Sequence, residues 1–118
     1  MTPDAFLNDW YGWITNQMSH ALLGLALTAL VAWGMRLATR MDMEAPALVL
    51  VVAVYFVGWE GLWQIWGAGM PDAIADTAFV ALGGAVGVSA WLRRAALLAA
   101  SLAAGAAMLA VGVWRRRR

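Results

Sequence analysis

The sequence predicts an all-α protein, an integral membrane bundle of four transmembrane helices with a short N-terminal amphipathic interfacial helix. Of its 118 residues, 64% are hydrophobic and 13% are charged, a balance too apolar for an ordinary soluble domain. Four apolar stretches have about the 20 residues that a helix needs to cross a hydrocarbon core of about 30 Å. No basic residue lies in the middle of any of them. We therefore expect residues 1–118 to form a single membrane domain.

Residues 1–19 predict the interfacial helix. A mainly apolar face recurs there every three to four residues, at Phe6, Trp10, Trp13 or Ile14, and Gln17 or Met18. This spacing is typical of a helix that lies along a membrane surface. Tryptophan is enriched at that level, so we expect Trp10 and Trp13 to act as membrane-surface anchors. Contact with a ligand or a pigment is the alternative for these two rings.

The four spans follow in order along the chain. We expect them at residues 20–38, 46–66, 73–92 and 95–114. Pro46 and Pro71 fall where the first turn of a helix accepts proline. The connections are short, which makes consecutive helices antiparallel neighbours in one compact bundle.

All eight basic residues are arginines near the ends of the spans. In a four-span topology the turns on one side carry Arg36, Arg40, Arg93 and Arg94, and the tail on the other side carries Arg115, Arg116, Arg117 and Arg118. We expect the tail to lie against lipid phosphates. Arginine-rich loops usually mark the cytoplasmic side, and four arginines on each side leave the orientation open. A three-span fold with a re-entrant last segment, or insertion in both orientations, would break this tie.

Three acidic side chains and a glutamine interrupt the second and third spans. Because these spans turn around near residues 67–71, side chains equally far from the turn lie at similar depth. Asp76 is then level with Glu60, and Asp72 is level with Gln64. The members of each pair on one helix are four residues apart and share a face.

The first span begins at His20, which the topology brings to the same side of the membrane. We expect a polar crevice in one leaflet, formed by His20, Glu60, Gln64, Asp72 and Asp76. Ionisable groups inside a membrane are costly and therefore candidates for function, so these five residues are the candidate ligand site. Helix capping is the alternative for Asp72, a place at the interface for His20, and an aqueous pocket for Glu60.

The sequence predicts where this crevice lies but not which ligand it binds. Carboxylates with one histidine could bind a divalent ion, contact a lipid head group or relay protons, so the sequence specifies no metal and no cofactor. It contains no HExxH motif, no P-loop, no dinucleotide-binding turn and no serine nucleophile elbow. A non-enzymatic role is favoured.

Small residues in the last two spans predict close helix packing. They are Gly83, Gly84 and Gly87 in the third span, and Ser101 and Gly105 in the fourth. Small residues at such spacing let helix backbones approach closely, either within one bundle or between subunits.

The polar pattern resembles that of a known group. The spacing E60-x3-Q64-x7-D72-x3-D76-T77-x5-G83-G84, with a histidine at the first span, is similar to the signature of VanZ-like small membrane proteins and related prophage membrane proteins, over about residues 20–88. Thr77 stands where such sequences often carry asparagine. The resemblance implies a cell-envelope role of poorly defined activity, and points to a multi-pass protein of the bacterial inner membrane.

Two other classes remain open. A holin, a phage protein that oligomerises to permeabilise the membrane, is similar in size, spans, small-residue faces and arginine tail. An accessory subunit of a larger membrane complex would suit the many tryptophans, conceivably with a pigment or haem at His20. The expected partners are therefore the lipid bilayer and either further copies of the chain or another membrane protein. Four arginines without a folded basic face do not indicate specific nucleic-acid binding.

Overall fold

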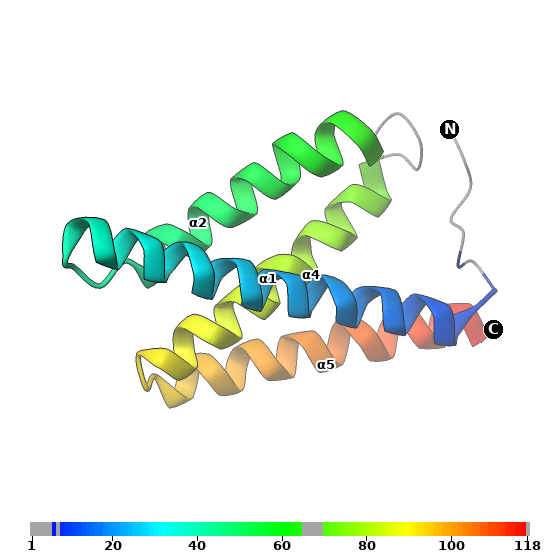
Figure 1. Cartoon of the computed structure of the whole chain (residues 1–118). Coiled ribbons are helices and arrows are strands. Elements are labelled where there is room, and N and C mark those ends of the chain that lie inside the picture. Colours follow the sequence, from blue (N-terminus) through cyan, green and yellow to red (C-terminus); the bar gives the residue numbers. More distant parts are fainter. Residues whose placement is uncertain (1–5, 7, 65–69, 118) are drawn as a thin grey trace.

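The structure, a computed structural model, describes residues 6, 8–64 and 70–117, with the backbone alone at 60–64, 70 and 72. Its elements are α1 (Trp10–Thr39), α2 (Glu44–Val54), η1 (Tyr55–Gln64), α4 (Met70–Trp91) and α5 (Ala95–Arg117). No strand occurs among these residues. Because α2 runs directly into η1, the chain makes four helical passes (Figure 1). The all-α class and the count of four helices are confirmed.

α1 is one continuous helix of 30 residues. The expected break between an interfacial helix ending at residue 19 and a first span beginning at His20 is absent, because no proline interrupts the stretch. Asp9 caps its start by accepting a hydrogen bond from the Gly12 N–H at 2.9 Å, as N-cap residues do. Arg40 ends it in the left-handed conformation, with φ 60°. At 1.5 Å per residue α1 is about 45 Å long, so it is longer than a hydrocarbon core.

The second pass changes its winding halfway. Pro46 lies in the first turn of α2, where its missing N–H does no harm. From Tyr55 onward the chain forms a π-helix, whose hydrogen bonds join residues five apart rather than four. The four-residue alignment expected for Glu60 and Gln64 assumed α-helical geometry, and η1 does not have it.

Three helical stretches are long and apolar enough to cross a membrane: Trp10–Thr39, Ala73–Trp91 and Ala95–Arg117. Glu44–Trp59 is apolar as well but shorter. That the second pass also crosses stays a prediction.

α4 is the central helix. It contacts α1, α2, η1 and α5, and its interface with α1 is the largest. The two backbones meet where a Cβ atom at Gly24 would overlap the carbonyl of Val80, and one at Gly83 would overlap the carbonyl of Ala21. Glycine is required at this crossing because any side chain would push the helices apart.

The other small residues pack less uniformly. Gly84 lies against Thr28 and Leu48, and Gly87 lies against Leu25. A Cβ atom at Gly105 would come no closer to a neighbour than 4.0 Å, and Ser101 is half-buried. α4 therefore packs tightly on α1, whereas α5 packs loosely on α4.

Polar as well as apolar side chains are buried, and many large apolar side chains are exposed. Among the described residues the buried polar side chains are Gln17, Thr28, Glu44, Asp76 and Ser89. Large hydrophobic side chains such as Leu22, Leu30, Trp33, Val49 and Val57 face outward. The bundle is 16 Å across its shortest dimension, against about 10–12 Å for a single helix, so it encloses few side chains.

The two ends of the chain are joined to each other. Arg116 Nε donates a hydrogen bond to the Phe6 carbonyl at 2.9 Å, and its guanidinium lies 4.4 Å from the centre of the Trp13 ring. Trp13 is 7% exposed and packs on Gly112 and edge-on against Phe79. Its ring therefore anchors α1 to α4 and α5 inside the bundle, and its place at the membrane surface stays a prediction.

Candidate functional site

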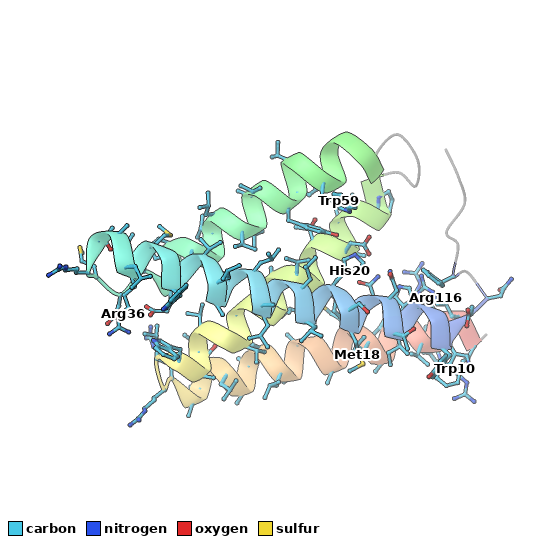
Figure 2. The ribbon with its side chains drawn as sticks, in the orientation of Figure 1. Trp10, Met18, His20, Arg36, Trp59 and Arg116 are labelled. Atoms are coloured by element: carbon cyan, nitrogen blue, oxygen red, sulfur yellow. The ribbon has the colours of Figure 1, made fainter. Side chains whose placement is uncertain are left out.

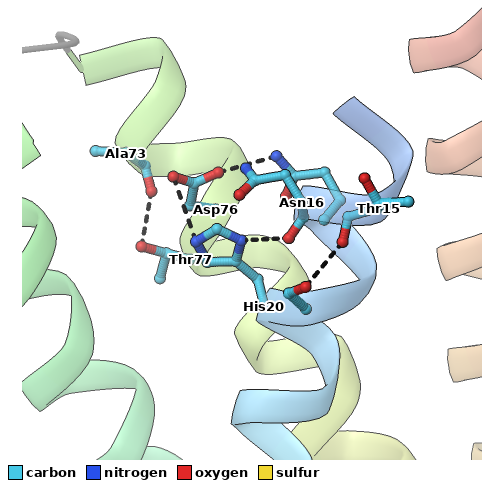
Figure 3. A network of polar contacts seen from close by, with 8 residues as sticks. Thr15, Asn16, His20, Ala73, Asp76 and Thr77 are labelled. Atoms are coloured by element: carbon cyan, nitrogen blue, oxygen red, sulfur yellow. Dashed lines mark hydrogen bonds and ion pairs between the residues drawn. The ribbon is translucent and has the colours of Figure 1, made fainter. Parts of the chain in front are cut away.

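A polar cluster joins α1 to α4 in the half of the bundle where α1 begins and α5 ends. We define it as Gln17, His20 and Asp76. Gln17 Nε2 donates to Asp76 Oδ1 at 2.9 Å, and His20 Nε2 lies 3.6 Å from Asp76 Oδ2 (Figure 3). Gln17 and His20 are one helical turn apart on the same face of α1. Asp76 is 2% exposed, so both of its oxygens face side chains of the neighbouring helix.

Both ring nitrogens of His20 face an oxygen. Its Nδ1 lies 2.7 Å from the carbonyl of Asn16, and because a carbonyl can only accept, Nδ1 is the donor in this contact. Its Nε2 faces Asp76 Oδ2. The ring therefore connects the backbone of α1 to the carboxylate on α4.

One polar atom of the cluster lacks a partner. Gln17 is fully buried, and within the part of the chain that the structure describes its Oε1 accepts no hydrogen bond. Turning the amide over would place this oxygen against the carboxylate, so the donation to Asp76 determines its orientation. An acceptor without a donor costs free energy in a buried site, and this one can take an N–H or O–H from a ligand or a water.

Aromatic rings surround the cluster. Tyr55, from η1, packs edge-on against His20 with ring centres 6.1 Å apart. Trp13, one turn before Gln17, packs edge-on against Phe79, which lies one turn after Asp76. These rings lower the local dielectric, which strengthens the interactions within the cluster.

The predicted ligand residues have different outcomes. His20 and Asp76 lie together, as the depth argument expects. Thr77, beside Asp76, donates to the Ala73 carbonyl of its own helix at 2.7 Å. The side chains of Glu60, Gln64 and Asp72 lie outside the described residues, so their place in the crevice stays a prediction.

Gln17 is the member of the cluster that sequence reasoning did not select. Its position three residues before His20 was the available signal, because two residues at that spacing face the same neighbour in a continuous helix. The expected helix break at residue 19 separated them.

The predicted membrane-surface residues at the two ends of the sequence lie where α1 begins and α5 ends. Trp10 is exposed, and the Arg117 guanidinium lies 5.9 Å from its ring centre. Arg115 is exposed as well, and Arg118 lies outside the described residues. Figure 2 shows Trp10 and Arg116 at one end of the bundle and Arg36 at the other.

A metal site would need more ligands than this cluster offers. No group of three or more histidine, cysteine, aspartate or glutamate side chains comes together in the described part of the chain. His20 and Asp76 alone supply two candidate donors.

Comparison with known proteins identifies no relative: no family model, curated protein or solved structure matches this chain. The functional interpretation therefore depends on the geometry of the chain itself.

Proposed function

We propose that this chain is a small, non-enzymatic, multi-pass protein of the bacterial inner membrane, with a cell-envelope role like that of VanZ-like proteins. In this proposal the polar cluster is the floor of a one-sided crevice that binds a polar ligand. The apolar exterior and the three long apolar helices support the membrane location. The polar pattern of residues 20–88 supports the family likeness.

The observation that carries the ligand site is the buried acceptor beside an ionisable pair. Packing alone does not require a His–Asp pair, because apolar side chains of similar volume usually stabilise a bundle as well. Ionisable residues within membrane helices are rare and usually functional. The unpartnered Gln17 Oε1 gives the ligand a chemical requirement, namely an N–H or O–H group that can donate to it.

The test is native mass spectrometry of the full chain purified in mild detergent. We expect a small-molecule adduct on the wild type that is lost in Gln17→Leu, which removes the acceptor, and in Asp76→Asn, which removes the carboxylate. Ser89→Ala is the matched control, since Ser89 is buried in α4 and its hydroxyl donates to the Ala85 carbonyl of its own helix. A wild type without adduct, or an adduct that both cluster variants retain, would contradict the ligand site.

The outer face of α5 favours a second candidate, a chain that associates through this helix. Only 6% of the most apolar 18-residue stretch of α5 is buried inside the bundle. Ala96, Ala100 and Ala104 are all exposed. Such a face suits close packing on another helix, in a holin-like oligomer or in a larger complex. The mass of the native particle distinguishes the candidates, because a monomer with an adduct supports the first and a homo-oligomer or stoichiometric partner supports the second.

A further inference from the structure

A cavity of about 1040 Å³ lies between the later halves of α1 and α4, away from the polar cluster. Its walls are mainly apolar, and they include Ala32 and Trp33 from α1 and Gly87 and Trp91 from α4. Small residues leave the space open, and both tryptophans expose most of their surface beside it. In a membrane, a space of this kind accommodates an acyl chain.

Charged side chains line the cavity where α1 ends and α2 begins. They are Arg36, Arg40 and Glu44. Arg36 lies 3.8 Å from Asp42, and both of these side chains are more than half exposed, so this contact holds the guanidinium weakly. Two arginines at the end of an apolar space match a phosphate, which guanidinium groups bind through two hydrogen bonds.

Glu44 makes the required ligand more specific. The residue is 8% exposed, and no hydrogen bond or ion pair joins its side chain to another residue in the described ranges. The start of a helix favours a negative charge but does not require its burial. A carboxylate with so little access to water is stabilised by a cation or by hydrogen-bond donors.

From the cavity and its three charges we propose a phospholipid site that selects phosphatidylethanolamine. One acyl chain occupies the apolar cavity, the phosphate lies at Arg36 and Arg40, and the primary ammonium donates to Glu44. Phosphatidylcholine has a cation without N–H donors, and phosphatidylglycerol has hydroxyl donors but no cation. Neither can therefore make the charge-assisted hydrogen bond that the ammonium makes to Glu44. The site depends on the proposed membrane location but uses no residue of the polar cluster.

The experiment titrates the detergent-purified full chain with each of these three phospholipids, matched in acyl chains, and measures bound lipid by native mass spectrometry. We expect about tenfold tighter binding of phosphatidylethanolamine than of the other two, the ratio expected for one charge-assisted hydrogen bond. Glu44→Gln should abolish that preference. The double variant Arg36→Gln/Arg40→Gln should weaken the binding of all three lipids.

Arg93→Gln/Arg94→Gln is the matched control, because these arginines are exposed at the same end of the bundle and do not line the cavity. It should bind as the wild type does. Gln17→Leu should also keep the lipid preference, which separates this site from the polar cluster. Equal binding of the three lipids by the wild type, tighter binding of phosphatidylglycerol, or an unchanged preference in Glu44→Gln would each overturn the proposal.

Discussion

Asp76 is the buried carboxylate that links α4 to α1. It is almost fully buried, with Gln17 on one oxygen and His20 on the other. Removing one member of a buried ion pair leaves a charge without compensation, and this costs more than the pair itself contributes. The two partners should therefore differ sharply in their tolerance of substitution.

Replacing each partner tests this asymmetry. His20→Leu leaves Oδ2 of the buried Asp76 without its partner and should lower the free energy of unfolding by about 3–5 kcal/mol. Asp76→Asn should cost about 1 kcal/mol or less, because its Oδ1 still accepts from Gln17 and its Nδ2 can donate to His20 Nε2. Denaturant unfolding in detergent micelles measures both changes. If the two variants are equally destabilised, His20 does not stabilise a buried carboxylate.

Sequence reasoning identified part of the cluster. His20 and Asp76 could be placed at one depth because the lengths of the spans and the position of the turn determine depth. The side-chain hydrogen bonds could not be predicted, since they depend on the rotation of α1 against α4. Gln17 was missed because the expected helix break at residue 19 separated it from His20.

At the scale of helices, the glycines of the third span indicated a close helix contact but not the helix that meets it. The structure shows α1 as the partner, through Gly24. Gly24 lies in a generally apolar stretch. The spacing of small residues in one helix therefore could not predict its role at the helix crossing. The π-helical winding of η1 could not be predicted either, because the spacing of Glu60 and Gln64 was interpreted with α-helical geometry.

The crossing of α1 and α4 makes a testable distinction between two glycines of one helix. Gly24→Ala should lower the free energy of unfolding by about 1–3 kcal/mol, since its methyl group would overlap the Val80 carbonyl and overpacking costs about that much. A Cβ atom at Gly34 would have no neighbour within 4 Å. Gly34→Ala should therefore be neutral or stabilising by up to about 1 kcal/mol. Thermal unfolding of the two variants measures the difference. Equal stabilities would show that the helices do not meet at Gly24.

At the scale of the whole molecule, the sequence predicted the number of helices, their order and the short turns, because hydrophobic length and proline positions determine them. The structure near the two ends of the chain was less predictable. The expected interfacial helix is continuous with the first span, and Trp13 points into the bundle because Gly112 and Phe79 leave room for its ring. Four passes place the start of α1 and the end of α5 at one end of the bundle, and both arginine-containing turns at the other (Figure 1).

The four-span arrangement is tested most directly by labelling single cysteines, since the chain has none of its own. Cysteines placed at Asn8, Asp42, Arg94 and Arg117 are reacted in intact cells with a maleimide that does not cross membranes. Positions 8 and 117 should be labelled to one extent and positions 42 and 94 to another, with the two fractions adding up to the whole even if the chain inserts in both orientations. If the second pass does not cross, position 94 will instead match position 8 and position 117 will match position 42, and the four-span membrane bundle will be wrong.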